Sequence, residues 1–295
     1  MGNNRRYLSD NRTNDQLYID DESSNDHDNI KKTLRRRTPL QLRSPLRTAA
    51  FAAGALALLV VAASSWRTLR LQGELVRADP DALAADPVLM RFGADRGAPV
   101  FAAHCASCHG AAGRGDPTWG VPDLTDQDWL YGEGRVSDIE QVVRFGIRAR
   151  QPRSWNLATM PAFGRAVPST TERVPPLTPS QIADVTAYLL SLGGRAADPD
   201  SAHRGRGIFA DTGGCYDCHA SDGKGDRAIG APDLTDRVWL YGDGGAQAIA
   251  RSITYGRQGV CPAWSGRLTP VQTRAVSLYV FSLSHRGAQP PAEVK

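Results

Sequence analysis

The sequence predicts a mainly α-helical protein in which one N-terminal transmembrane helix is followed by two small helical domains of similar sequence. Thr48–Trp66 contain no charged residue and are typical of a membrane-spanning segment. The motif Cys105–His109 recurs as Cys215–His219, 110 residues later, and several neighbouring motifs recur with it. With 295 residues, the chain has room for roughly two domains.

Residues 1–47 are rich in Asn, Asp, Ser and Arg and show no hydrophobic periodicity, so we expect a disordered tail. Within it, residues 31–47 hold seven lysines and arginines and no acidic residue. The net charge of the whole chain is only +4, which does not indicate a nucleic-acid partner. The apolar segment that follows explains the basic run better.

The segment Thr48–Trp66 has 19 residues, which as a helix extend about 28 Å, close to the ~30 Å hydrocarbon core of a bilayer. Arg47 and Arg67 bracket it, and Trp66 suits the membrane interface. Because the positive charges before it outnumber those after it, the positive-inside rule places the N-terminus in the cytoplasm and the rest outside. The alternative is a signal peptide cleaved after Val61-Ala62-Ala63. We favour an anchor retained in membrane lipid, because such a leader would be unusually long.

The two C-x-x-C-H motifs are the attachment signature of a c-type haem. Each thiol can add across one vinyl group of the porphyrin, and the adjacent histidine then becomes the proximal iron ligand. A redox dithiol or half of a zinc site is the alternative, but the recurrence favours haem. We therefore expect two covalently bound haem c groups, on a periplasmic chain because haem attachment occurs outside the bacterial membrane. The covalent sites are Cys105, Cys108, Cys215 and Cys218, and the iron ligands are His109 and His219.

Repeated motifs divide the rest of the chain, since Pro122–Asp126 returns as Pro232–Asp236 and Trp129–Gly132 as Trp239–Gly242. The second copy is shorter, with two deletions near the loop expected to carry its distal ligand. The predicted parts are a linker (67–90, with a short helix at Asp81–Ala85), a first haem domain (91–194), a second linker (195–202), a second haem domain (203–288) and a tail (289–295).

Helix-start signals place helices inside the first domain. Residues 94–103 should be helical and lead into the first haem motif. Ser137 is expected to cap a helix that ends at about residue 145, with Glu140 closing a capping box. Thr178-Pro179-Ser180-Gln181 predicts the start of the last helix, because a cap, a proline at N1 and a glutamine at N3 occur together.

Met160 is the expected distal ligand of the first haem, because it lies 51 residues after His109 in a loop before the last helix. The alternative is that Met160 only fills the core. The chain has three methionines, and Met1 and Met90 are poorly placed for this role.

The second haem has Cys261 at the position equivalent to Met160. Three alternatives stay open. Cys261 ligates the iron, His203 or His285 does so, or the sixth site is open or holds water. We rank Cys261 first, and because a thiolate lowers the potential whereas a methionine raises it, the second haem should then have the lower potential. Arg148 and Arg257 are candidate partners of the haem propionates, or solvated surface residues.

From Leu75 to the C-terminal helix, the chain resembles the di-haem subunit III (CcoP or FixP) of cbb3-type cytochrome c oxidases. The resemblance rests on the two haem motifs together with Pro232–Asp236, Trp239–Gly242, Met160–Gly164, Gly256–Gly259 and Pro262–Trp264. The family's second haem normally has a methionine where this chain has Cys261.

This resemblance implies two tandem class I cytochrome c domains, anchored in the bacterial inner membrane and exposed to the periplasm. They would take electrons from a soluble cytochrome c or a quinol-oxidising complex. The acceptors would be the mono-haem cytochrome c subunit and the haem-copper catalytic subunit of the oxidase, in aerobic respiration. The chain would be an electron-transfer subunit and not itself the catalytic chain.

Two other functions are weighed against this one. The first is a free-standing membrane di-haem cytochrome that serves another redox enzyme. The second is a haem-based gas or redox sensor in which Cys261 is a displaceable ligand. Carbon monoxide binding to the second haem would favour the sensor, and fast electron exchange with a soluble cytochrome c would favour an electron carrier.

Overall fold

The computed structural model describes residues 45–166 and 176–285, and the description below is confined to these. Residues 1–44 of the predicted 1–47 tail and the predicted C-terminal tail at 289–295 lie outside them, whereas residues 45–47 begin a helix and are not the disordered tail that was predicted. The described residues form helices and loops with isolated β-bridges and no strand, which confirms the mainly α fold. The chain divides into two units, Met1–Ala62 and Ala63–Lys295, according to the contacts within each.

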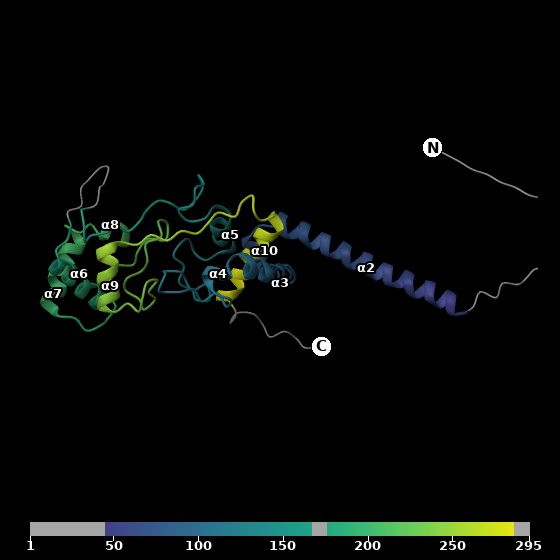
Figure 1. Cartoon of the computed structure of the whole chain (residues 1–295), viewed down its shortest axis with the longest axis horizontal. Coiled ribbons are helices and arrows are strands. Elements are labelled where there is room, and N and C mark those ends of the chain that lie inside the picture. Colours follow the sequence, from purple (N-terminus) through teal and green to yellow (C-terminus); the bar gives the residue numbers. More distant parts are fainter. Residues whose placement is uncertain (1–44, 167–175, 286–295) are drawn as a thin grey trace, which may run out of the picture. The chain divides into compact units, whose positions relative to one another are not determined.

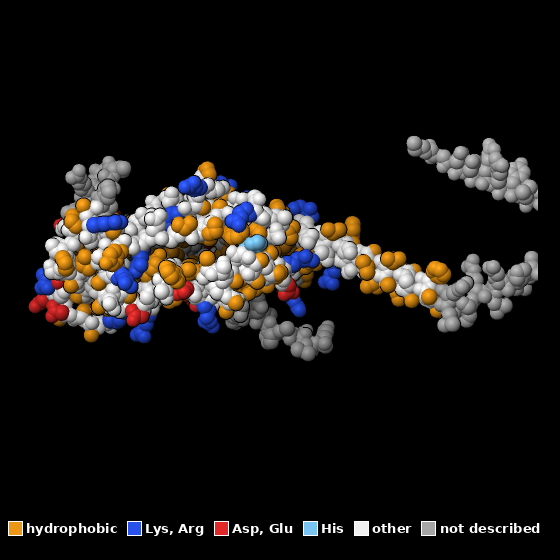
Figure 2. Space-filling view, viewed as in Figure 1, with side chains coloured by type: hydrophobic (Ala, Val, Ile, Leu, Met, Phe, Trp, Pro, Cys, Tyr) orange, Lys and Arg blue, Asp and Glu red, His pale blue; other side chains and the backbone are white. Residues whose placement is uncertain are grey.

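Helix α2 (Pro45–Arg77) contains the predicted transmembrane segment. It is the one helix among the described residues that is long and apolar enough to cross a membrane. Its apolar side chains are exposed along the segment, as Phe51 at 80 % shows, and Figure 2 displays them along the helix. The helix continues past Trp66 to Arg77, so the first part of the predicted 67–90 linker is helical.

The last turns of α2 extend beyond the apolar segment because their side chains have a core to enter. Leu75 is fully buried and clusters with Leu89 and Leu278. The buried Arg274 guanidinium donates to the carbonyl oxygens of Leu75 (3.0 Å) and Ala78 (2.9 Å), which accept no bond within the helix. The last turns of α2, at the start of the unit Ala63–Lys295, are therefore packed against the globular part of that unit.

The elements after α2 include η2 (Asp81–Ala85), α3 (Pro87–His104) and α5 (Val136–Phe145). The predicted short helix at Asp81–Ala85 is thus confirmed. The predicted cap at Ser137 is wrong, because Arg135 is the N-cap of α5. The Ser137 hydroxyl instead donates to Asp81 at 2.8 Å, and Glu140 binds Arg274.

The last helix of each repeat packs on the other repeat. Helix α10 (Pro270–Ser284) lies against α3 and α5, whereas α6 (Pro179–Leu192) lies against α7 (Pro199–Ala210) and α9 (Ala246–Tyr255). The first group is therefore α3, α4 (Ala106–His109), α5 and α10, and the second group is α6, α7, α8 (Tyr216–His219) and α9. Figure 1 shows both groups. The predicted domains at 91–194 and 203–288 assumed that the helices of each repeat pack on one another, whereas in the structure the last helix of each repeat packs on the other repeat.

Both groups use a glycine to bring two helices together. A side chain at Gly97 of α3 would overlap the Ala275 carbonyl of α10, and one at Gly205 of α7 would overlap the Asp184 carbonyl of α6. In the second group, Arg204 also donates to Asp184 at 2.8 and 3.0 Å. The close approach of the backbones therefore requires glycine at each crossing.

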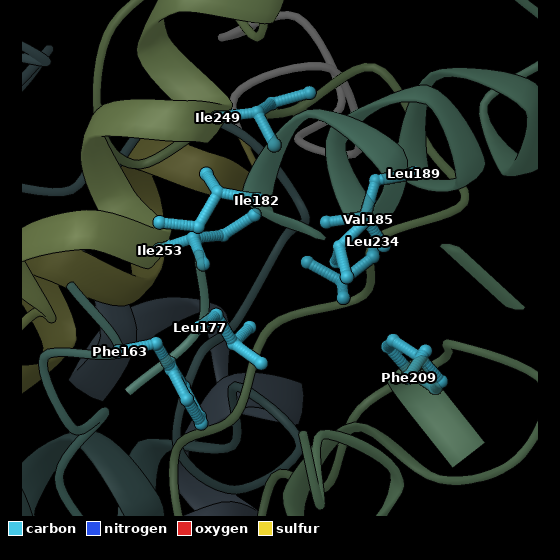
Figure 3. Packing of buried hydrophobic residues seen from close by; sticks show 9 residues of the cluster. All are labelled: Phe163, Leu177, Ile182, Val185, Leu189, Phe209, Leu234, Ile249 and Ile253. Atoms are coloured by element: carbon cyan, nitrogen blue, oxygen red, sulfur yellow. The ribbon is translucent and has the colours of Figure 1, made fainter. Parts of the chain in front are cut away.

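The core of the second group mixes side chains from the two repeats. Phe163, Leu177 and the buried face of α6 come from the first repeat, and Phe209, Leu234, Ile249 and Ile253 come from the second. In Figure 3 these side chains point toward one another from α6, α7, α9 and the connecting loops. Burial of this cluster, at roughly 25 cal/mol per Å² of apolar surface, stabilises the exchanged arrangement.

Candidate haem sites

The two motif histidines have the same environment in both repeats. His109 ends α4 and lies with Nδ1 3.3 Å from the Pro122 carbonyl oxygen, and His219 ends α8 with Nδ1 3.1 Å from the Pro232 carbonyl oxygen. Burial lowers the pKa of each imidazole, which favours its neutral form. A neutral imidazole that donates through Nδ1 has its Nε2 lone pair free for a metal.

The motif cysteines are unpaired thiols, with Cys105 and Cys215 at the N-caps of α4 and α8 and the second cysteine of each motif inside the helix. Burial raises the pKa of Cys105 and of Cys215 to about 11, with a further contribution from the second cysteine of each motif. Each pair lies within one turn of its histidine. This donor set fits a covalently attached haem.

A cavity of about 410 Å³ opens beside His219 in the second group. Its apolar lining includes Leu189, Ile249 and Ile253. Trp239 also lines it, and the buried Nε1 of Trp239 has no hydrogen-bond partner. An apolar chamber with one unpaired donor suits a haem, whose propionate can accept that hydrogen bond.

Met160 lies in this cavity, together with Cys215, Cys218 and His219. Its loop is held by a pair of backbone hydrogen bonds, from Met160 N to Arg257 O (3.1 Å) and from Arg257 N to Met160 O (3.2 Å). The structure therefore brings Met160 to the histidine of the second repeat, and not to His109, with which sequence order had paired it.

The Cys261 loop makes the matching pair of bonds on the other side. Cys261 N donates to Ile147 O (3.0 Å), and Ile147 N donates to Cys261 O (2.9 Å). Burial raises the pKa of Cys261 to about 11, with a smaller contribution from the nearby Cys105 and Cys108. The structure thus brings Cys261 to the first haem motif, whereas sequence order had paired it with His219.

Arg148 and Arg257, the two candidate propionate partners, both line the cavity of the second group. Arg257 stacks over the Tyr241 ring at 4.0 Å, donates to the Ser252 hydroxyl at 2.9 Å, and has a pKa lowered mainly by burial. Arg148 adopts a left-handed φ of 48°. Its guanidinium donates to the carbonyl oxygens of Ala158 (3.0 Å) and Gly259.

These contacts give Arg148 a role that the sequence did not indicate. Ala158 is two residues before Met160, and Gly259 is two residues before Cys261, so one side chain ties the two distal-ligand loops together. Trp239, which lines the cavity, was not among the predicted site residues. Its recurrence as Trp129 was the available signal for a shared function.

The other histidines of the described residues have different surroundings. His203 is exposed on α7, and His104 packs its ring against Trp264 at 5.0 Å. His285 stacks on Phe281 at 3.9 Å, with its Nδ1 2.9 Å from the Phe281 carbonyl oxygen. The structure therefore does not bring His203 or His285 into the cavity beside His219.

Comparisons with known proteins agree with this site. The cytochrome c family profile matches residues 94–193, and that of cbb3-type cytochrome c oxidase subunit III matches residues 200–280. The chain is 42 % identical over 221 residues to the cbb3-type cytochrome c oxidase subunit CcoP of Rhodobacter capsulatus, covering 72 % of this chain and 70 % of that protein. It is 38 % identical to CcoP of Cereibacter sphaeroides, covering 72 % and 69 %.

A FixP subunit of the same kind of oxidase, from Sinorhizobium medicae, is 36 % identical over 201 residues, covering 68 % of this chain and 64 % of that protein. Cytochrome c domains carry haem c, which agrees with the attachment motifs. The chain belongs to the CcoP/FixP family of electron-transfer subunits of cbb3-type cytochrome c oxidases.

Proposed function

We propose that this chain carries two covalent haem c groups and passes electrons to the haem-copper catalytic subunit of a cbb3-type oxidase. The main support is the cavity that is lined by Cys215, Cys218 and His219 together with Met160. When bound, the haem supplies a one-electron Fe(III)/Fe(II) couple.

The residues around this cavity have separate roles in the proposal. Cys215 and Cys218 would hold the porphyrin, and the Pro232 carbonyl favours the tautomer of His219 that leaves Nε2 free to bind iron. Met160 would provide a thioether ligand, which favours the reduced state. Arg257 and the Trp239 Nε1 group bind and orient propionate oxygens, and the apolar lining excludes water.

Membrane attachment through α2 keeps the haem domains close to the other subunits. The N-terminus is assigned to the cytoplasm and the haem domains to the periplasm, because seven basic residues precede the apolar segment. The relatives are named as subunits of cbb3-type cytochrome c oxidases, and the partners in this proposal are a mono-haem cytochrome c subunit and the haem-copper subunit. Electrons arrive from a soluble cytochrome c or a quinol-oxidising complex.

The test is affinity purification of the tagged native chain from membranes in mild detergent, followed by identification of bound proteins and an oxygen-consumption assay. Recovery with a haem-copper subunit and a mono-haem cytochrome, with oxidase activity, is the expected result. Recovery alone, or with an unrelated dehydrogenase, would refute the assignment to an oxidase. The intact mass should exceed that of the polypeptide by two haems, and by one haem in the Cys215→Ala/Cys218→Ala variant.

A further inference from the structure

The two distal loops are related by the sequence repeat and are held in the same way. Ile147 and Arg257 occupy equivalent positions after α5 and α9, and each forms two backbone hydrogen bonds with the distal loop of the other repeat. Ile147 pairs with Cys261, and Arg257 pairs with Met160. Because this second pairing places Met160 beside His219, its counterpart should place Cys261 beside His109.

The neighbouring contacts extend this correspondence along both loops. Phe163 N donates to Ile253 O and Trp264 N donates to Val143 O, both at 3.0 Å, and these donors and acceptors are again repeat equivalents. The glycine that precedes each pair lies against the opposite loop, since a side chain at Gly146 would overlap the Cys261 carbonyl oxygen. The exchange is therefore reciprocal over several residues.

We propose that Cys261 is the distal ligand of the iron in the haem attached at Cys105 and Cys108, opposite His109, so that the two repeats exchange distal ligands. This inference rests on the proposed function only in requiring that both motifs carry haem. The Cys261 thiol releases its proton to solvent and donates a sulfur electron pair to the iron, which keeps its oxidation state. Cys261 takes the coordination position that solvent would otherwise occupy.

The exchange reverses the order of haem potentials that the sequence predicts. A thiolate lowers the potential of the first haem, whereas methionine raises that of the second. Arg148 and Arg257 both line the second cavity, and positive charges there favour the reduced iron further. The first haem therefore stays oxidised at potentials that reduce the second, and the second haem carries the electrons.

The test uses the full-length holoprotein in detergent, in its ferric state, with electron paramagnetic resonance as the readout. The native chain should show two low-spin signals, one with the compressed g-values of a thiolate-bound haem and one of histidine–methionine type. In Cys261→Met the thiolate signal should disappear and a second histidine–methionine signal should replace it. In Cys261→Ala the same haem should become high-spin and bind cyanide.

The haem that loses its ligand is identified with the proximal variants His109→Ala and His219→Ala, each of which keeps both attachment cysteines. The thiolate signal should be altered only in His109→Ala, and the methionine signal only in His219→Ala. The reverse pairing would overturn the exchange. Where a variant fails to fold, redox titration of Cys261→Met decides. One of the two reduction steps should move to a higher potential in this variant. The haem responsible is the one whose attachment cysteines must be present for that reduction step to be seen.

Two further results bear on the inference separately from the proposed function. A native spectrum without a thiolate signal, and unchanged in Cys261→Ala, would overturn ligation by Cys261. Purification of Cys261→Met together with the oxidase subunits would leave the proposed function intact whichever spectrum is found. Failure of the native chain to bind those subunits would refute the proposed function and leave the ligand assignment standing.

Discussion

The Met160 loop should be displaced by one methyl group added to the other repeat. Gly256 adopts φ 69° and ψ 175°, a region that is open almost only to glycine. A Cβ atom there would lie 2.5 Å from the Met160 carbonyl oxygen and 2.8 Å from the Pro161 carbonyl carbon. The backbone strain costs about 1–3 kcal/mol and the overpacking about 1–3 kcal/mol.

Together these terms reach roughly 2–6 kcal/mol, a large part of the ~5–15 kcal/mol that stabilises a typical domain. We therefore expect Gly256→Ala to weaken or abolish the red charge-transfer absorption of ferric iron bound by methionine sulfur, with both haems still attached. Absorption spectroscopy of the holoprotein measures this.

Gly110→Ala is the matched control. Gly110 has similar backbone angles, φ 75° and ψ 157°, but no heavy atom lies within 4 Å of its added Cβ. Its repeat equivalent is already an alanine, Ala220, at φ 59° and ψ 165°. The control should keep the methionine band. Without the exchange, Met160 would pack against Gly146, the equivalent glycine of its own repeat. An unchanged methionine band in Gly256→Ala, or loss of the band in Gly146→Ala alone, would therefore refute the exchange.

Four other variants test the packing and the cavity. Gly205→Ala should destabilise the fold by about 1–3 kcal/mol in urea unfolding, because its Cβ overlaps the Asp184 backbone, whereas Gly207→Ala, with nothing within 4 Å, should stabilise it by about 0.5–1 kcal/mol. Hydrogen bonds from Arg204 and Ser201 lower the pKa of Asp184. The ionised carboxylate therefore stabilises the fold above its ordinary pKa, and this stabilisation is lost as pH falls through the lowered value. Asp184→Asn should make the free energy of unfolding depend less on pH in the acid range. Trp239→Phe should lower the potential of one haem in redox titration, because it removes a donor from a propionate, and an unchanged potential would contradict that role.

Much of the fold follows from local signals that the structure bears out. The apolar run that begins at Thr48 lies in one helix, and the Thr178 and Thr269 hydroxyls each cap a helix whose N3 glutamine binds back to the cap. The Ser137 cap fails because a distant residue, Asp81, competes for its hydroxyl. Local pattern does not include such a tertiary partner.

The exchange could not be predicted from periodicity, because α6 and α10 begin with the same cap and present similar apolar faces. Either helix could cover either haem motif, and the short connection at 195–202 allows both arrangements. The difference in free energy between the exchanged and the unexchanged packing therefore depends on a few long-range contacts. Which of these contacts favour the observed arrangement is visible only when both repeats are compared at equivalent positions.

One buried ion pair makes that comparison decisive. Arg274 of α10 has 9 % of its side chain exposed and binds Glu140 of α5. The repeat equivalent of Glu140 in α9 is Ala250. If α10 packed within its own repeat, the Arg274 guanidinium would therefore face an alanine and lose its carboxylate partner.

An unpaired buried charge costs several kcal/mol, more than one helix contact returns. In the observed arrangement Arg274 also satisfies the Leu75 and Ala78 carbonyl oxygens at the end of α2. The same guanidinium thus favours the exchange and fixes the start of the globular unit. Because α10 follows Cys261 after eight residues, seating α10 in the first group also carries the Cys261 loop to the first haem motif.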